Sequence, residues 1–337
     1  MPWIDAARVI SIFAVVFLHI SASVVTEADF GSSFWWHGNF YDSMVRWCVP
    51  VFVMISGALL LDESRVEDAV TFYKRRVGRL LLPLIFWTIA FLFWNAIKAR
   101  FSGAEFGLVQ AVKSVASGKP HYHMWFLFMI FGLYLFTPLI RTLVRNAGRR
   151  ELWFFVIVMF SLSALDELLG IFFDDEDGFF LFWFLPYIPY FICGHLIASS
   201  KRNDGKFISL VVFVASVFVT AIGFYLLTGM KGPEKGIYFY GNLSVSVIPM
   251  SIALMWLLRS LSFSERVAEW LGAMLSALTL GIYLIHPVFL ESVRFFYFKA
   301  KDYYPLLSVP ALTVLIFGGS LMFAFVLRKT PYLKRVI

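Results

Sequence analysis

Apolar residues gather along the chain in long runs that are separated by short polar segments. Each run is close to the ~20 residues that an α-helix needs to cross the hydrocarbon core of a bilayer. This pattern predicts an all-α polytopic membrane protein with about ten transmembrane helices. The predicted spans cover residues 4–25, 41–61, 80–99, 122–143, 151–169, 179–199, 207–228, 238–259, 275–297 and 306–328.

The composition supports this interpretation. Of the 337 residues, 60% are hydrophobic and 15% are charged, and the mean hydropathy is +0.78. A soluble domain of this length could not bury so much apolar side chain. The net charge is +7, but the basic residues lie in short loops between the apolar runs, so we expect no nucleic-acid partner. Cys48 and Cys193 fall within apolar runs, where cysteine usually serves as a small hydrophobic side chain.

The distribution of Lys and Arg predicts the orientation. With the N-terminus inside, 18 of these residues fall in inner loops and nine in outer loops. The excess follows the positive-inside rule and predicts that both termini are cytoplasmic. Two predicted outer loops, 26–40 and 166–178, carry no Lys or Arg, and the acidic run 174–177 is expected to be a solvated part of the second.

The first apolar run resembles a signal peptide, because Ser21-Ala22-Ser23 has the form of a cleavage site. We expect a retained first helix, because Asp5 and Arg8 are charged residues in the leader and the apolar residues continue to Val25. Every loop is short, so we expect residues 1–337 to form a single membrane domain without a soluble domain.

Two ionisable residues of the first predicted helix are candidates for function. Arg8 and His19 are eleven residues apart, which places them on one helix face about 16 Å apart along the axis. Ionisable groups inside a membrane are costly and usually face a protein interior or a water-filled cavity. In the alternative interpretation, Arg8 reaches the lipid headgroups and His19 is a buried structural histidine. A histidine can exchange a proton near neutral pH, which suits a general base, a gate or a proton relay.

Two pairs of charged residues in the next segments are further candidates for function. Asp42 and Arg46 are four residues apart and can form an ion pair, either at the membrane edge or in a functional site. Arg76 and Arg79 lie one helical turn apart before the third apolar run. Arginine binds phosphate through forked hydrogen bonds, so this pair is a candidate site for a nucleotide-like ligand, although cytoplasmic loops are usually basic.

Histidine and aromatic residues recur near two later spans. His121, His123 and Trp125 lie at the outer start of the fourth span, where aromatic side chains serve either an interfacial belt or a sugar ring. Two histidines without a third ligand nearby are a weak metal signal, so we predict no metal site. His286 lies within the ninth span, directly before Pro287, which disrupts the helix ladder and frees a carbonyl group.

Five of these segments together resemble the bacterial membrane acyltransferase-3 family, whose members O-acylate cell-envelope polysaccharides. The five are a basic residue and a histidine separated by ten residues (Arg8 and His19), Pro50 to Gly57, the Arg-x-x-Arg of Arg76 and Arg79, His123 to Phe126, and Gly281 to His286. They occur in this order over most of the chain. The short form, without an esterase-like domain, is similar to the enzymes that acetylate enterobacterial common antigen.

The resemblance implies an acyl-coenzyme A co-substrate, usually acetyl-CoA, used from the cytoplasmic side of the bacterial inner membrane, with no bound cofactor. The acceptor would be a hydroxyl of an envelope glycan or lipid-linked saccharide at the outer face. His19 would be catalytic, by direct transfer or through an acyl-histidine. The other site residues would bind substrate, with Arg76 and Arg79 at the donor phosphates: Arg8, Arg46, Arg76, Arg79, His123, Trp125 and His286.

A second class of function fits several of the same features. A polytopic transporter of a sugar, amino acid or glycolipid would also have about ten spans with buried charges. The Arg-x-x-Arg before the third apolar run and the lack of a visible internal repeat favour the acyltransferase.

Overall fold

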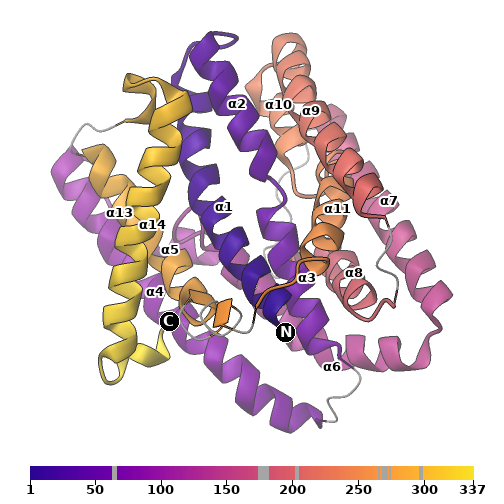
Figure 1. Cartoon of the computed structure of the whole chain (residues 1–337). Coiled ribbons are helices and arrows are strands. Elements are labelled where there is room, and N and C mark those ends of the chain that lie inside the picture. Colours follow the sequence, from indigo (N-terminus) through magenta and orange to yellow (C-terminus); the bar gives the residue numbers. More distant parts are fainter. Residues whose placement is uncertain are drawn as a thin grey trace.

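The computed structural model describes residues 1–62, 67–173, 182–201, 205–264, 266–267, 272, 275–295 and 299–337, with the side chains of 77, 78 and 170–173 left aside. Helices and turns account for all regular structure in these ranges, and they contain no strand. The protein is an all-α polytopic membrane protein, as predicted. Both chain ends lie in the lower part of the bundle as drawn (Figure 1).

The helices follow one another with short connections. The α-helices are α1 (Pro2–Glu27), α2 (Ser33–Val45), α3 (Cys48–Leu60), α4 (Ala69–Ser102), α5 (Leu108–Ala116), α6 (Trp125–Asn146), α7 (Arg149–Phe173), α8 (Ile188–Ala198), α9 (Lys206–Lys231), α10 (Pro233–Gly236), α11 (Val247–Arg259), α13 (Thr279–Phe295) and α14 (Pro305–Lys329). Short 3-10 turns are η2 (Leu185–Tyr187), η3 (Ile237–Tyr240), η5 (Ser276–Leu278), η6 (Ala300–Asp302) and η7 (Leu333–Arg335).

The ten predicted spans correspond to apolar helices of two lengths. Among the described residues, eight helical segments are long and apolar enough to cross a membrane, and two shorter apolar helices cover 185–198 and 247–259. The prediction of a continuous helix over 238–259 was wrong in its first half, which consists of η3 and a turn through Gly241 and Asn242. Non-helical backbone at membrane depth is stable where protein or a cavity covers it. Here the Tyr190 hydroxyl donates to the Asn242 carbonyl (2.7 Å).

The second predicted span, 41–61, is in fact two helices. α2 begins at Ser33, where the Ser32 hydroxyl caps the helix by accepting from the Trp35 amide (3.1 Å). Most of the predicted outer loop 26–40 is therefore helical. The chain breaks at Arg46, before α3, because Pro50 has no N–H for the Arg46 carbonyl and its ring would clash with that group in a continuous helix.

Other predicted loops and boundaries also changed. The predicted loop 166–178 is helical as far as Phe173, and the acidic run 174–177 lies outside the described residues. α4 begins at Ala69, with the Asp68 carboxylate accepting from the Thr71 amide (2.9 Å), so the predicted span 80–99 starts about three turns too late. Arg76 and Arg79 consequently lie inside α4 and not at its start.

The interior helices include α1 and α13, which carry His19 and His286. α1, α3, α8 and α13 are largely buried, whereas α4, α7, α9 and α14 present most of their apolar side chains outward, as lipid-facing helices do. α3 and α8 approach each other most closely at two glycines. A methyl group on Gly57 would overlap the carbonyl group of Phe191, and one on Gly194 would overlap that of Met54. Small residues permit such backbone contact between membrane helices.

Candidate active site

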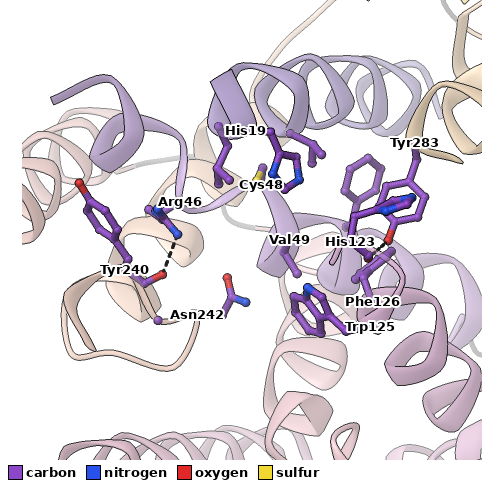
Figure 2. A pocket seen from close by; sticks show the side chains of 14 residues that line it. His19, Arg46, Cys48, Val49, His123, Trp125, Phe126, Tyr240, Asn242 and Tyr283 are labelled. Carbon is purple, nitrogen blue, oxygen red and sulfur yellow. Dashed lines mark hydrogen bonds between the residues drawn. The ribbon is translucent and has the colours of Figure 1, made fainter. Parts of the chain in front are cut away.

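His19 faces a cavity in the middle of the bundle. The cavity has a volume of about 230 Å³, and its walls come from α1, α3, α6, α13 and the turn after η3. Figure 2 shows His19 above this space, with Arg46 and Tyr240 on one side and His123 and Tyr283 on the other. His19 is partly exposed, and neither of its ring nitrogens has a hydrogen-bond partner in the part of the chain that the structure describes. Both nitrogens are thus available to a ligand.

Four of the six histidines of the chain form one cluster of contacting rings, and two of them, His19 and His123, line the cavity. The rings of His19 and His286 stack at 5.3 Å between centroids, and the His286 ring contacts that of His123 at 5.6 Å. The Nδ1 atoms of His123 and His121 are 2.9 Å apart, at hydrogen-bond distance. The structure therefore joins the three histidines that the sequence assigned to the site (His19, His123 and His286) with His121, which the sequence named without a role.

Hydrogen bonds fix the orientation of His286. Its Nδ1 lies 2.8 Å from the carbonyl oxygen of Tyr283. That carbonyl is free because Pro287, four residues later, has no N–H to donate to it. Since a carbonyl can only accept, Nδ1 carries the proton of the neutral ring and Nε2 is an acceptor. Nε2 of His286 is buried and has no partner among the described residues.

Glu291 orients the other end of the histidine cluster. Its carboxylate accepts from Trp94 Nε1 (2.7 Å), pairs with Lys98 (2.8 Å), and lies 3.1 Å from His121 Nε2. His121 Nε2 therefore donates to Glu291, and its Nδ1 accepts from His123 Nδ1. Burial lowers the pKa of His121 despite the Glu291 carboxylate, so the ring is neutral at pH 7.

The hydrogen bond between His121 and His123 also sets which nitrogen of His123 carries the proton. With its Nδ1 committed as a donor, His123 presents an unprotonated Nε2 that is buried and without a partner among the described side chains. The Tyr283 hydroxyl also bonds the His123 carbonyl and holds this turn in place. His123 and His286 thus each keep an unprotonated Nε2 atom within the histidine cluster.

Arg46 lines the cavity on the side away from the chain ends. Its guanidinium pairs with the fully buried Asp42 and lies 3.8 Å from the centre of the Tyr240 ring. The predicted Asp42–Arg46 ion pair is confirmed, and its Arg46 member lines the cavity. Trp125 and Asn242 also line the cavity, and the Asn242 amide donates to the Tyr187 hydroxyl (3.0 Å).

A second polar region lies toward the chain ends. Arg8 is 3.9 Å from Asp5 and donates to the Ser276 hydroxyl (3.4 Å). Tyr134 interacts electrostatically with both Arg8 and Arg76, so these two arginines flank one region. Arg76 is half-buried, and its Nε has no partner within the described ranges.

Arg79 does not join this region. It is exposed, whereas Arg76 is half-buried one turn earlier on α4. The sequence grouped the two arginines by their spacing, but the structure places only Arg76 in the electrostatic neighbourhood of Arg8.

Sequence analysis missed the roles of Glu291, Lys98 and Trp94. Glu291 is 170 residues from His121, and no local spacing connects the two. Tyr240 was also missed, because a tyrosine at the edge of a predicted span is most simply explained as part of the interfacial belt.

The fold and the site together define a polytopic membrane protein with a histidine-lined cavity inside the bundle. The family model described as an acyltransferase domain matches residues 1–329, and the chain belongs to this acyltransferase-3 family. It is a membrane acyltransferase. Comparison with curated proteins and with solved structures gave no match.

Proposed function

We propose that this protein transfers an acyl group, most simply acetyl, from acyl-coenzyme A on the side of the chain ends to a hydroxyl of an envelope glycan or glycolipid on the opposite side. The membrane would be the bacterial cytoplasmic membrane, with the chain ends in the cytoplasm, in agreement with the excess of Lys and Arg in the inner loops.

The position of His19 carries this proposal. His19 is a partly exposed histidine with two unengaged nitrogens in a cavity inside the bundle. The basic region of Arg8 and Arg76 lies toward the chain ends, and Arg46 lines the opposite side. A general base between two polar regions suits a reaction whose donor and acceptor come from opposite sides.

The reaction follows from these positions. The acceptor hydroxyl attacks the thioester carbonyl carbon, and His19 takes the hydroxyl proton as the C–O bond forms. The C–S bond then breaks, and the imidazolium returns the proton to the departing coenzyme A thiolate. Atoms and charge balance without another reactant, so the net products are the ester and the thiol.

The donor would be held by the arginines nearer the chain ends. Arg76 has a buried, unpartnered Nε, and a guanidinium with free N–H groups is a strong donor to phosphate oxygens. Arg8 lies on the same helix as His19, about 16 Å from it along the axis, so it would bind a part of the donor remote from the thioester. Arg79, which is exposed, would attract the donor at longer range.

The other histidines would set the protonation state of His19. The acceptor nitrogens of His123 and His286 stabilise a positive charge on a neighbouring ring, and His286 stacks directly on His19. We assign His123 and His286 this supporting role. An acyl-histidine intermediate on His19 is the competing mechanism, and trapping of labelled protein after rapid mixing with donor alone would reveal it.

The test is transfer of label in proteoliposomes. Purified protein receives radiolabelled acetyl-CoA and lipid-linked glycans extracted from bacterial envelopes. His19→Gln should abolish transfer, whereas His37→Gln, which makes the same change at a histidine outside the cavity, should retain it. Equal activity of wild type and His19→Gln would exclude His19 from the chemistry, and donor-independent glycan movement would favour a transporter.

A further inference from the structure

A second cavity lies beyond Arg46, at the end of the bundle away from the chain ends. Its volume is about 600 Å³, and it lies between the ends of α1, α2 and α9 and the turn η3. Arg46 and Tyr240 line both cavities and are the boundary between them. The volume is within the range of about 300–1,000 Å³ that is usual for small-molecule sites.

Three polar groups that line this cavity have a buried atom without a partner among the described residues. They are Oδ1 of Asp42, Nε of Arg46 and Oγ1 of Thr228. Asp42 is fully buried, and only its other oxygen bonds Arg46. Buried polar atoms are normally satisfied, so three unsatisfied atoms at one cavity call for a ligand that supplies both donors and acceptors.

A rigid stack holds the boundary. Trp35 and Phe224 stack at 5.7 Å, Phe224 and Tyr240 at 4.1 Å, and the Arg46 guanidinium covers the other face of Tyr240 at 3.8 Å. The Tyr240 hydroxyl also donates to Oδ1 of Asn39 (2.7 Å). The polar atoms are therefore presented from a preformed wall, which lowers the cost of ordering a ligand.

We propose that this second cavity, called the outer cavity below, binds a sugar residue of the acceptor. This assignment rests on the proposed acyl transfer. A carboxylate oxygen, a guanidinium N–H and a hydroxyl match the alternating donors and acceptors of adjacent ring hydroxyls. Asp42 and Arg46 neutralise each other, so the ligand portion that they select is uncharged. The half-exposed Phe30 and the edges of the stacked rings provide an apolar wall for the sugar C–H groups.

Thr228→Val tests this assignment without disturbing the fold. Valine has the shape of threonine, and the Thr228 hydroxyl makes no hydrogen bond within the described chain. The variant should raise the acceptor KM by roughly two- to tenfold, the effect of one neutral hydrogen bond, with the donor KM unchanged. Thr142→Val, an exposed position on α6, is the matched control and should leave both constants unchanged.

Ala22→Phe provides a steric test. Ala22 lines the outer cavity, and a phenyl group there should block glycan transfer while donor binding remains. Ala215→Phe adds the same group on the exposed face of α9 and should have no effect. Full transfer by Ala22→Phe, or an unchanged acceptor KM in Thr228→Val, would overturn the proposal.

Direct binding separates this proposal from the proposed function. Equilibrium binding of the tritiated lipid-linked glycan fraction is measured without donor. Glycan binding that is lost in Ala22→Phe, with no acyl transfer by wild type, would leave the sugar site standing and refute the acyltransferase mechanism. Transfer by wild type, with glycan binding equal in both proteins, would refute the site alone.

Discussion

Gly57→Ala should destabilise the protein and open the wall of the cavity. Gly57 ends the Pro50–Gly57 segment, and its added methyl carbon would lie 2.6 Å from the carbonyl carbon of Phe191, where ordinary contact starts near 3.4 Å. α3 and α8 would have to separate by about 0.8 Å or more. The obstructing atoms belong to the backbone, so no rotamer change relieves the overlap, and the cost should reach the upper end of overpacking, about 3 kcal/mol.

Thermal unfolding of the detergent-solubilised protein measures this effect. A loss of about 3 kcal/mol should lower Tm by roughly 4 °C for a chain of this size. Transfer should also fall, because Cys48, Val49 and Phe52 of α3 line the cavity. Gly318→Ala on α14 is the matched control, since a methyl group there meets no described atom within 4 Å. Equal Tm values for the two variants would refute the proposed backbone contact.

Three further predictions concern the site. Arg76→Gln should raise the donor KM by roughly ten- to hundredfold, the value of a charge-assisted hydrogen bond, with kcat unchanged at saturating donor; an unchanged KM in steady-state kinetics would remove Arg76 from the donor site. Glu291→Gln should lower kcat by roughly ten- to hundredfold and leave both KM values unchanged, because the amide no longer fixes which nitrogen of His121 carries the proton. A variant with the kcat of wild type would contradict the tautomer assigned to His121. Burial lowers the pKa of His121, so below about pH 6.5 the unfolded chain binds a proton that the folded protein does not. Tm should therefore fall as the pH decreases from 7 to 5, and it should fall less steeply in His121→Phe. Identical pH profiles of Tm for the two proteins would contradict this pKa assignment.

The sequence predicted the membrane architecture because hydrophobicity in a bilayer is a local property. Each helix satisfies its own backbone groups, so an apolar run of sufficient length is itself a structural element. The two errors have different causes, the first local and the second tertiary. The break at Arg46 depends on Pro50, and the turn at Asn242 depends on Tyr190 from another helix. Tertiary contacts that stabilise irregular backbone leave no mark in a hydropathy pattern.

The candidate site was predictable where one helix sets the geometry. The separation of Arg8 and His19 follows from helix periodicity alone, and so does the approach of Asp42 to Arg46. The contact of His121 with Glu291 depends on the packing of distant segments, which spacing cannot reveal. Helix spacing alone grouped Arg79 with Arg76, but one turn of α4 separates the half-buried Arg76 side chain from the exposed Arg79 side chain.

The most direct test of the central claim is acyl transfer by wild type and His19→Gln in proteoliposomes with acetyl-CoA inside and lipid-linked glycan outside. The account predicts label on the glycan with wild type, none with His19→Gln, and donor binding in both. Transfer at the wild-type rate by a folded His19→Gln protein would contradict it.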